Sequence, residues 1–123
     1  MKFSDYFSKD FETSENNIYD TLKTHYYRAR IEDVRNVIFS LIENEKGTVI
    51  DDNEKYSEIY YETPGYNCTI TLVATTPVEV AVDFRITTYD FLSFGKGKKV
   101  IERLYNDLDS KLPFKGIALN KVR

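Results

Sequence analysis

Residues 78 to 87 alternate apolar and polar side chains, and this pattern constrains the fold more than any other feature of the chain. The apolar positions are Val78, Val80, Val82, Phe84 and Ile86, and the positions between them are Glu79, Ala81, Asp83, Arg85 and Thr87. A period of two is that of a β-strand with one covered face and one wet face. A parallel strand buried on both faces would instead read as a continuous apolar run. The segment therefore predicts an antiparallel sheet that is covered on one side only, with Glu79, Asp83 and Arg85 in water.

Other segments complete the sheet and supply its cover. Four further strands are predicted at residues 23–29, 48–51, 57–62 and 67–74, joined by polar or Pro-Gly turns. Apolar residues recur every three or four positions over 31–46, which predicts an amphipathic helix that Gly47 ends in the left-handed conformation. A second helix follows the glycines near residue 96 and ends before Pro113. The predicted fold is α+β, in the order β-α-β-β-β-β-α, with one antiparallel sheet and two amphipathic helices packed on one face.

The length of the chain bounds its organisation. A chain of 123 residues has room for one core, so residues 1–123 are expected to form a single domain. Residues 1–22 are predicted to be a helical or irregular lead-in, because Phe3, Tyr6, Phe7 and Phe11 have helix-like spacing before a polar stretch. Residues 115–123 are predicted to be a loose tail.

Composition narrows the location of the protein and the class of its partners. With 41% hydrophobic and 30% charged residues, the chain is suited to folding rather than to disorder. It contains no signal-like h-region and no apolar run long enough to cross a bilayer, so we expect no membrane association. Cys68 is the single cysteine, which favours a reducing compartment and therefore the cytoplasm. The net charge of −3 argues against nucleic acid as a partner.

Reactive side chains are scarce. His25 is the single histidine, and Cys68 falls on the predicted core face, so neither is predicted to be catalytic. One Cys and one His cannot complete a structural zinc site. The acidic turn at residues 51–54 lacks the spacing of a calcium loop. We therefore predict no catalytic residue, no metal and no cofactor.

Two regions are candidates for binding. The lysine-rich segment, Gly95, Lys96, Gly97, Lys98 and Lys99, opens the second helix, where unpaired N–H groups and glycines suit an anionic small molecule. Its spacing is not that of a nucleotide-binding P-loop, and a plain structural turn is the alternative reading. Residues 91–123 also hold eight basic and three acidic residues, a local excess of positive charge.

The second candidate is the wet face of the sheet. Tyr60 and one of Tyr26 or Tyr27 are expected there beside Arg85. Exposed tyrosines can form a platform for a protein partner, or they can simply shield the sheet. We therefore expect a non-enzymatic binding or interaction module that uses this face, the lysine-rich segment, or both. The alternatives are a carrier of a small or lipid-like ligand and an enzyme that works through carboxylates and tyrosines in a pocket between sheet and helix. A homodimer formed through an exposed edge or face is a further option.

Three segments carry a resemblance to a known group of proteins. They are Phe11-Glu-Thr-Ser-Glu-Asn16, Thr24-His-Tyr-Tyr-Arg-Ala29 and Phe94-Gly-Lys-Gly-Lys-Lys-Val-Ile101. Together the chain resembles a bacterial domain-of-unknown-function family of small cytosolic proteins over most of residues 11–112, which implies no activity or ligand. The predicted order of elements is also similar to the half-repeat of TATA-binding-like folds and to a small helix-grip domain. Such likeness of fold does not establish function.

Overall fold

A computed structural model describes residues 10–15, 17, 22–55, 57–89 and 96–117. Its helices are α1 (Ile31–Asn44) and α2 (Lys96–Lys111). Its strands are β1 (Asp10–Glu12), β2 (His25–Tyr27), β3 (Thr48–Asn53), β4 (Glu58–Glu62), β5 (Tyr66–Thr76), β6 (Glu79–Thr88) and β7 (Phe114–Ile117). The sheet has the order β3-β4-β5-β6-β2-β7, and β1 also pairs with β6. Every pairing between these strands is antiparallel.

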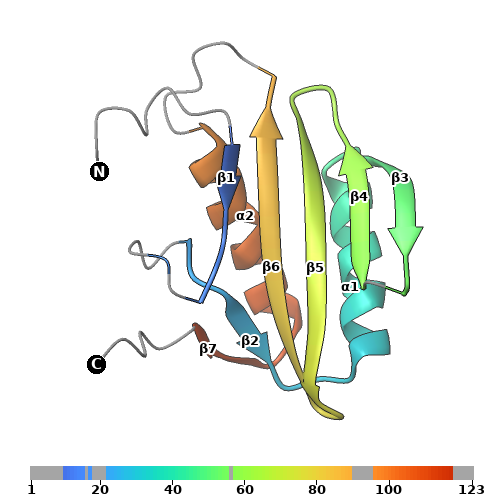
Figure 1. Ribbon diagram of the computed structural model, residues 1–123, viewed down its shortest axis with the longest axis vertical. Coiled ribbons are helices and arrows are strands. Elements are labelled where there is room, and N and C mark those ends of the chain that lie inside the picture. The colour runs from blue at the N-terminus through green and yellow to red at the C-terminus, as the bar shows by residue number, and fades with distance from the viewer. Residues whose placement is uncertain (1–9, 16, 18–21, 56, 90–95, 118–123) are drawn as a thin grey trace.

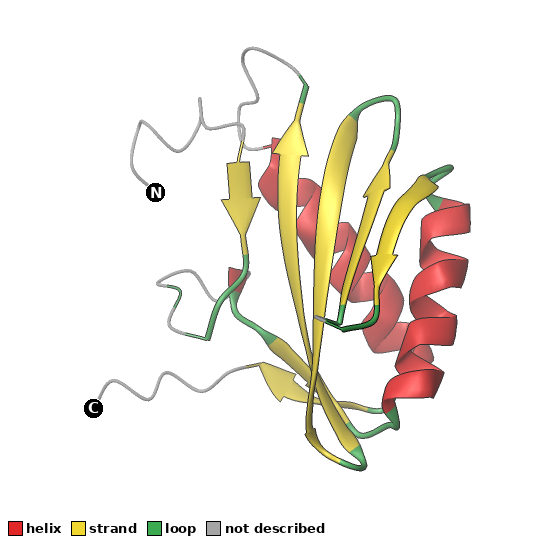
Figure 2. Ribbon diagram, turned by 45° about the vertical axis from the view of Figure 1, so that its right-hand side comes forward, coloured by secondary structure: helices red, strands yellow, loops and turns green. Residues whose placement is uncertain are grey.

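Both helices lie on the same side of the sheet (Figures 1 and 2). The interface between the two layers is filled by side chains that are 0–1% exposed, among them Ile38, Leu41, Ile70, Phe84, Ile101 and Leu104. The expected α+β fold, with one antiparallel sheet covered on one face, is therefore confirmed. The other side of the sheet, across β3, β4, β5, β6 and β1, carries no helix of the described residues, and we call it the open face.

Two strands lie outside the predicted order of elements. Residues 10–12 form β1, so the prediction of a helical or irregular lead-in is wrong for these residues, because Phe11 pairs with Ile86 and packs into the core. Residues 114–117 form β7 against β2, so the prediction of a loose tail is wrong for residues 115–117. Residues 1–9 and 118–123 lie outside the described part of the chain.

The alternation in β6 is confirmed with one exception at its start. Val80, Val82, Phe84 and Ile86 are at most 1% exposed, whereas Val78 is 62% exposed. Val78 belongs to the turn between β5 and β6, where Thr76 already pairs with Glu79, so the chain reverses before Val78 can reach the core. The prediction that Val78 points inward is therefore wrong.

The end of α1 also differs from expectation. Lys46 takes the left-handed conformation with φ of 59°, and the N–H groups of Lys46 and Gly47 donate to the carbonyls of Glu43 and Ile42. This is the Schellman arrangement, with lysine at the position where glycine is commonest. Gly47 is needed for another reason, because a Cβ there would lie 2.7 Å from Cδ2 of Tyr61.

A polar network joins both helices to β5. Arg103 on α2 donates to the Glu45 carboxylate at 2.6 and 3.0 Å, and the Tyr66 hydroxyl donates to the same carboxylate at 2.8 Å. Burial alone would raise the pKa of Glu45, but these donors outweigh it, so the pKa lies below its usual value. The network fixes the end of α1 against α2. Within the described residues, neither helix is long and apolar enough to span a membrane.

Candidate functional site

One row of side chains crosses the open face. Tyr60 pairs with Thr69, Thr69 pairs with Arg85, and Arg85 pairs with Glu12, so side chains from β4, β5, β6 and β1 stand in line. Cross-strand partners share a face of the sheet. Arg85 is exposed, and its Nε lies 3.8 Å from a Glu12 carboxylate oxygen. The structure thus brings Tyr60 and Arg85, both predicted as binding residues, into a single row.

The open face is strongly acidic. By strand alternation and register, its described residues include six with carboxyl groups, namely Glu12, Asp51, Glu58, Glu62, Glu79 and Asp83, and one arginine, Arg85. Lys115 reaches Glu79 from β7 and, together with Thr75, lowers the pKa of that carboxyl. The carboxylates of Glu58 and Glu62 flank Tyr60 along β4. Attraction for cations therefore comes from several strands at once.

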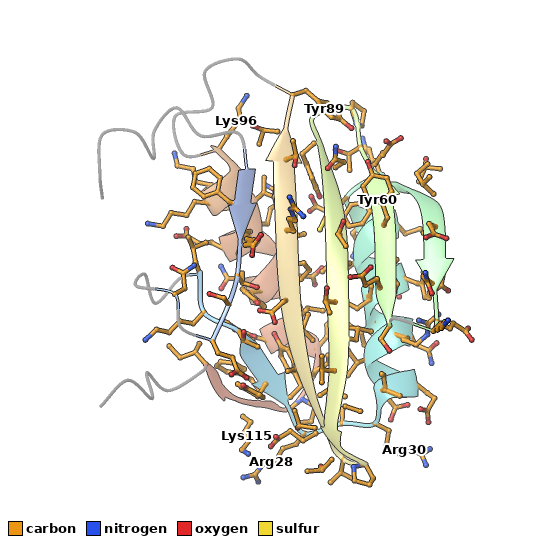
Figure 3. The ribbon with its side chains drawn as sticks, in the orientation of Figure 1. Arg28, Arg30, Tyr60, Tyr89, Lys96 and Lys115 are labelled. Carbon is orange, nitrogen blue, oxygen red and sulfur yellow. The ribbon has the colours of Figure 1, made fainter. Side chains whose placement is uncertain are left out.

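Tyrosines accompany these carboxylates. The Tyr60 hydroxyl donates to Glu62 at 3.0 Å, and Tyr89, which is 47% exposed, follows the end of β6. Figure 3 places Tyr60 and Tyr89 toward the same end of the sheet. Of the two candidates on β2, Tyr26 lies on the open side and donates to Glu15, whereas Tyr27 is fully buried against α2. Aromatic rings beside carboxylates suit partners that carry lysine or arginine.

The Asp83 side chain, on the open face, is partly covered by Thr13 and Thr24. The hydroxyls of Thr13 and Thr24 both donate to Asp83 Oδ1 at 2.6 Å. Burial raises the pKa of the Asp83 carboxyl, and these two hydrogen bonds oppose part of the rise. Ala81, expected on the wet side, is only 5% exposed. The prediction of a wet face is thus wrong at Ala81 and holds for Arg85, while Glu79 and Asp83 are half-buried.

The lysine-rich segment lies apart from the open face. Lys96, Gly97, Lys98 and Lys99 form the first turn of α2, in the helix layer, and Gly95 lies outside the described residues. Gly97 is buried because Phe11 lies over it, and a Cβ there would stand 2.6 Å from Cδ2 of Phe11. Close packing thus accounts for this glycine without a ligand. The structure does not bring the segment together with Tyr60 and Arg85.

The sequence predicted no catalytic role for His25, yet the structure places aromatic and carboxylate side chains around its ring. His25 is 8% exposed, and its ring stacks on Tyr105 with centroids 3.6 Å apart and planes at 5°. Its Nδ1 lies 3.0 Å from Asp109 Oδ1, which also accepts the Tyr27 hydroxyl at 2.6 Å. His25, Glu102, Tyr105 and Asn106 line a depression of about 320 Å³. The spacing of Glu102, Tyr105, Asn106 and Asp109 along one stripe of α2 is the signal that could have pointed to this cluster.

Cys68 occupies the core position predicted for it. The residue is fully buried, and burial raises the pKa of its thiol. Among the described residues, no group of three or more His, Cys, Asp or Glu side chains is arranged to hold a metal ion. The predicted acidic turn at residues 51–54 is wrong for residues 51–53, which belong to β3, and Asp52 of this strand pairs with Arg35 of α1 at 2.5 Å.

Comparisons with known proteins add no further assignment. No protein-family model matches the chain, and neither a curated protein nor a solved structure matches it significantly. The resemblance to a bacterial domain-of-unknown-function family therefore stays a prediction.

Proposed function

We propose that this protein is a binding module whose open face takes a polypeptide segment rich in lysine and arginine. The observation that carries the proposal is the charge of that face, where six carboxyl groups outnumber the basic side chains of Arg85 and Lys115 among the described residues. Carboxylates that share one face repel one another, and a cationic partner relieves that repulsion. The same charge disfavours nucleic acid, which is itself an anion.

The chemistry of Tyr60 supports a polypeptide rather than a simple counterion. Its ring is half-exposed between Glu58 and Glu62, and its hydroxyl is held by Glu62. A lysine or arginine side chain can lie over such a ring while its charge meets the adjacent carboxylates. The threonines Thr69 and Thr71 next to it offer hydroxyls to a partner backbone. The surface therefore suits a polypeptide whose basic side chains contact the carboxylates and whose backbone contacts the threonine hydroxyls.

The packing of the two layers favours this proposal over a ligand carrier. The sheet-helix interface is filled by fully buried side chains. A carrier would require an enclosed apolar cavity at that place. The fully buried thiol of Cys68 is consistent with a reducing compartment, so we place the module in the cytoplasm.

Fluorescence anisotropy with a labelled Lys/Arg-rich peptide tests the proposal. The double variant Glu58→Gln/Glu62→Gln removes two carboxylates of the open face. At about 0.5 to 1 kcal/mol for each exposed charge, affinity should fall roughly five- to thirtyfold. Raising the salt concentration should weaken binding to the unaltered protein, because exposed charges are screened.

A matched control separates the open face from net charge. The double variant Glu32→Gln/Glu43→Gln removes two exposed carboxylates from α1, in the other layer. It should change affinity by less than about twofold, since these charges lie in the helix layer and are screened by solvent. Equal loss in both double variants would show that only net charge matters and would refute the proposed surface.

A further inference from the structure

The His25 side chain is held in one orientation by three groups from two elements, α2 and β7. Tyr105 of α2 stacks on its ring at 3.6 Å, and Phe114 of β7 packs against it with centroids 4.8 Å apart. Asp109 of α2 holds Nδ1 at 3.0 Å. An imidazole fixed in this way presents its remaining nitrogen, Nε2, in one direction.

The hydrogen bonds of Asp109 determine which nitrogen carries the proton. The Tyr27 hydroxyl donates to Asp109 Oδ1, so that oxygen is an acceptor, and His25 Nδ1 must therefore donate to it. Burial lowers the pKa of His25 below 6.5, although the contacts with Asp109 and the charge of Asp83 oppose the shift. The lowered pKa favours the uncharged ring, in which Nε2 is a hydrogen-bond acceptor.

The depression beside this ring offers mainly acceptors. Glu102 contributes a carboxylate and Asn106 an amide from the same stripe of α2 as Asp109. The Tyr105 hydroxyl is already committed to the Val82 carbonyl at 2.7 Å and to Thr13 at 3.1 Å, so the depression receives the Tyr105 ring and not its hydroxyl. A ligand that donates hydrogen bonds and carries positive charge complements this set of groups.

We propose that the depression lined by His25, Glu102, Tyr105 and Asn106 binds a small molecule through a primary ammonium group. Its N–H groups would donate to His25 Nε2, the Glu102 carboxylate and the Asn106 carbonyl oxygen. The volume of about 320 Å³ suits a small molecule rather than a folded partner. This site lies between β2 and α2, on the helix-covered side of the sheet, and does not depend on the function proposed for the open face.

NMR of the imidazole tests the inference directly, because His25 is the single histidine and its ring signals are unambiguous. Methylammonium chloride, added at a pH above 7 to the full chain, should shift the His25 Nε2 signal along a saturable curve. Tetramethylammonium, which has the same charge and no N–H donor, should leave the signal in place. Sodium phosphate should also leave it in place.

Two variants complete the experiment. Glu102→Gln should weaken methylammonium binding by at least about tenfold, because it removes the charge-assisted hydrogen bond. Glu43→Gln removes an equal charge from α1, which does not line the depression, and should leave binding unchanged. The inference is overturned if methylammonium fails to shift the His25 signal, if tetramethylammonium or phosphate shifts it equally, or if the two variants behave alike. Because the readout is one side chain on the helix-covered side of the sheet, failure here would leave the open-face proposal standing.

Discussion

Gly97→Ala should destabilise the fold by about 1 to 2 kcal/mol. The added Cβ would lie 2.6 Å from Cδ2 of Phe11 and 3.4 Å from its Cγ and Cε2. Carbon atoms in favourable contact are about 3.5 to 4.0 Å apart, so the Phe11 ring must move by about 1 Å. Such overpacking typically costs about 1 to 3 kcal/mol, and the better helix propensity of alanine returns at most about 1 kcal/mol.

A double-mutant cycle measured by urea denaturation isolates the clash. In a Phe11→Val background the ring is gone, so Gly97→Ala should be neutral or should stabilise the fold by up to about 1 kcal/mol. The predicted coupling between positions 97 and 11 is therefore about 2 kcal/mol. If Gly97→Ala stabilised the unaltered protein, or had the same effect in both backgrounds, the packing explanation for Gly97 would be wrong.

Three further predictions test individual buried groups. Lowering the pH through 6.5 should reduce the free energy of unfolding, because the unfolded chain binds the His25 proton more tightly than the folded chain. Urea denaturation above and below pH 6.5 measures this change. The variant His25→Gln should show a weaker dependence of stability on pH. Thr13→Val should cost about 1 to 3 kcal/mol by urea denaturation, because the Thr13 hydroxyl donates to Asp83 and accepts the Phe84 N–H, whereas Thr13→Ser should keep most of the stability. Cys68 should react with Ellman's reagent only when the chain unfolds, since it is fully buried with a raised pKa, and prompt labelling of the native protein would contradict this.

The sequence patterns predicted the parts of the fold that depend on periodicity. The two helices and strands β4 to β6 repeat their apolar residues over enough positions to reveal the covered face. Strands β1 and β7 have three and four residues, too few for a period to show, and they form because β6 and β2 offer free edges to pair with. Val78 was misplaced because periodicity cannot tell where a turn begins.

Of the two candidate sites, the sequence could predict the one on the open face but not the one around His25. Strand alternation alone could place Tyr60 and Arg85 on one face, and cross-strand register then makes them neighbours of Thr69. No local pattern could predict the contact of His25 with Asp109, because the two residues lie 84 positions apart and meet only after α2 packs on β2. Sequence reasoning about a lone histidine therefore missed its carboxylate partner.

Chemical-shift mapping with the Lys/Arg-rich peptide tests the central claim most directly. Backbone amides of β4, β5 and β6, with Tyr60, Thr69 and Arg85 at their centre, should shift on titration, while those of α1 should stay in place. Shifts confined to the helix layer, or a uniform weak effect over the whole chain, would contradict the account of the open face as the binding surface.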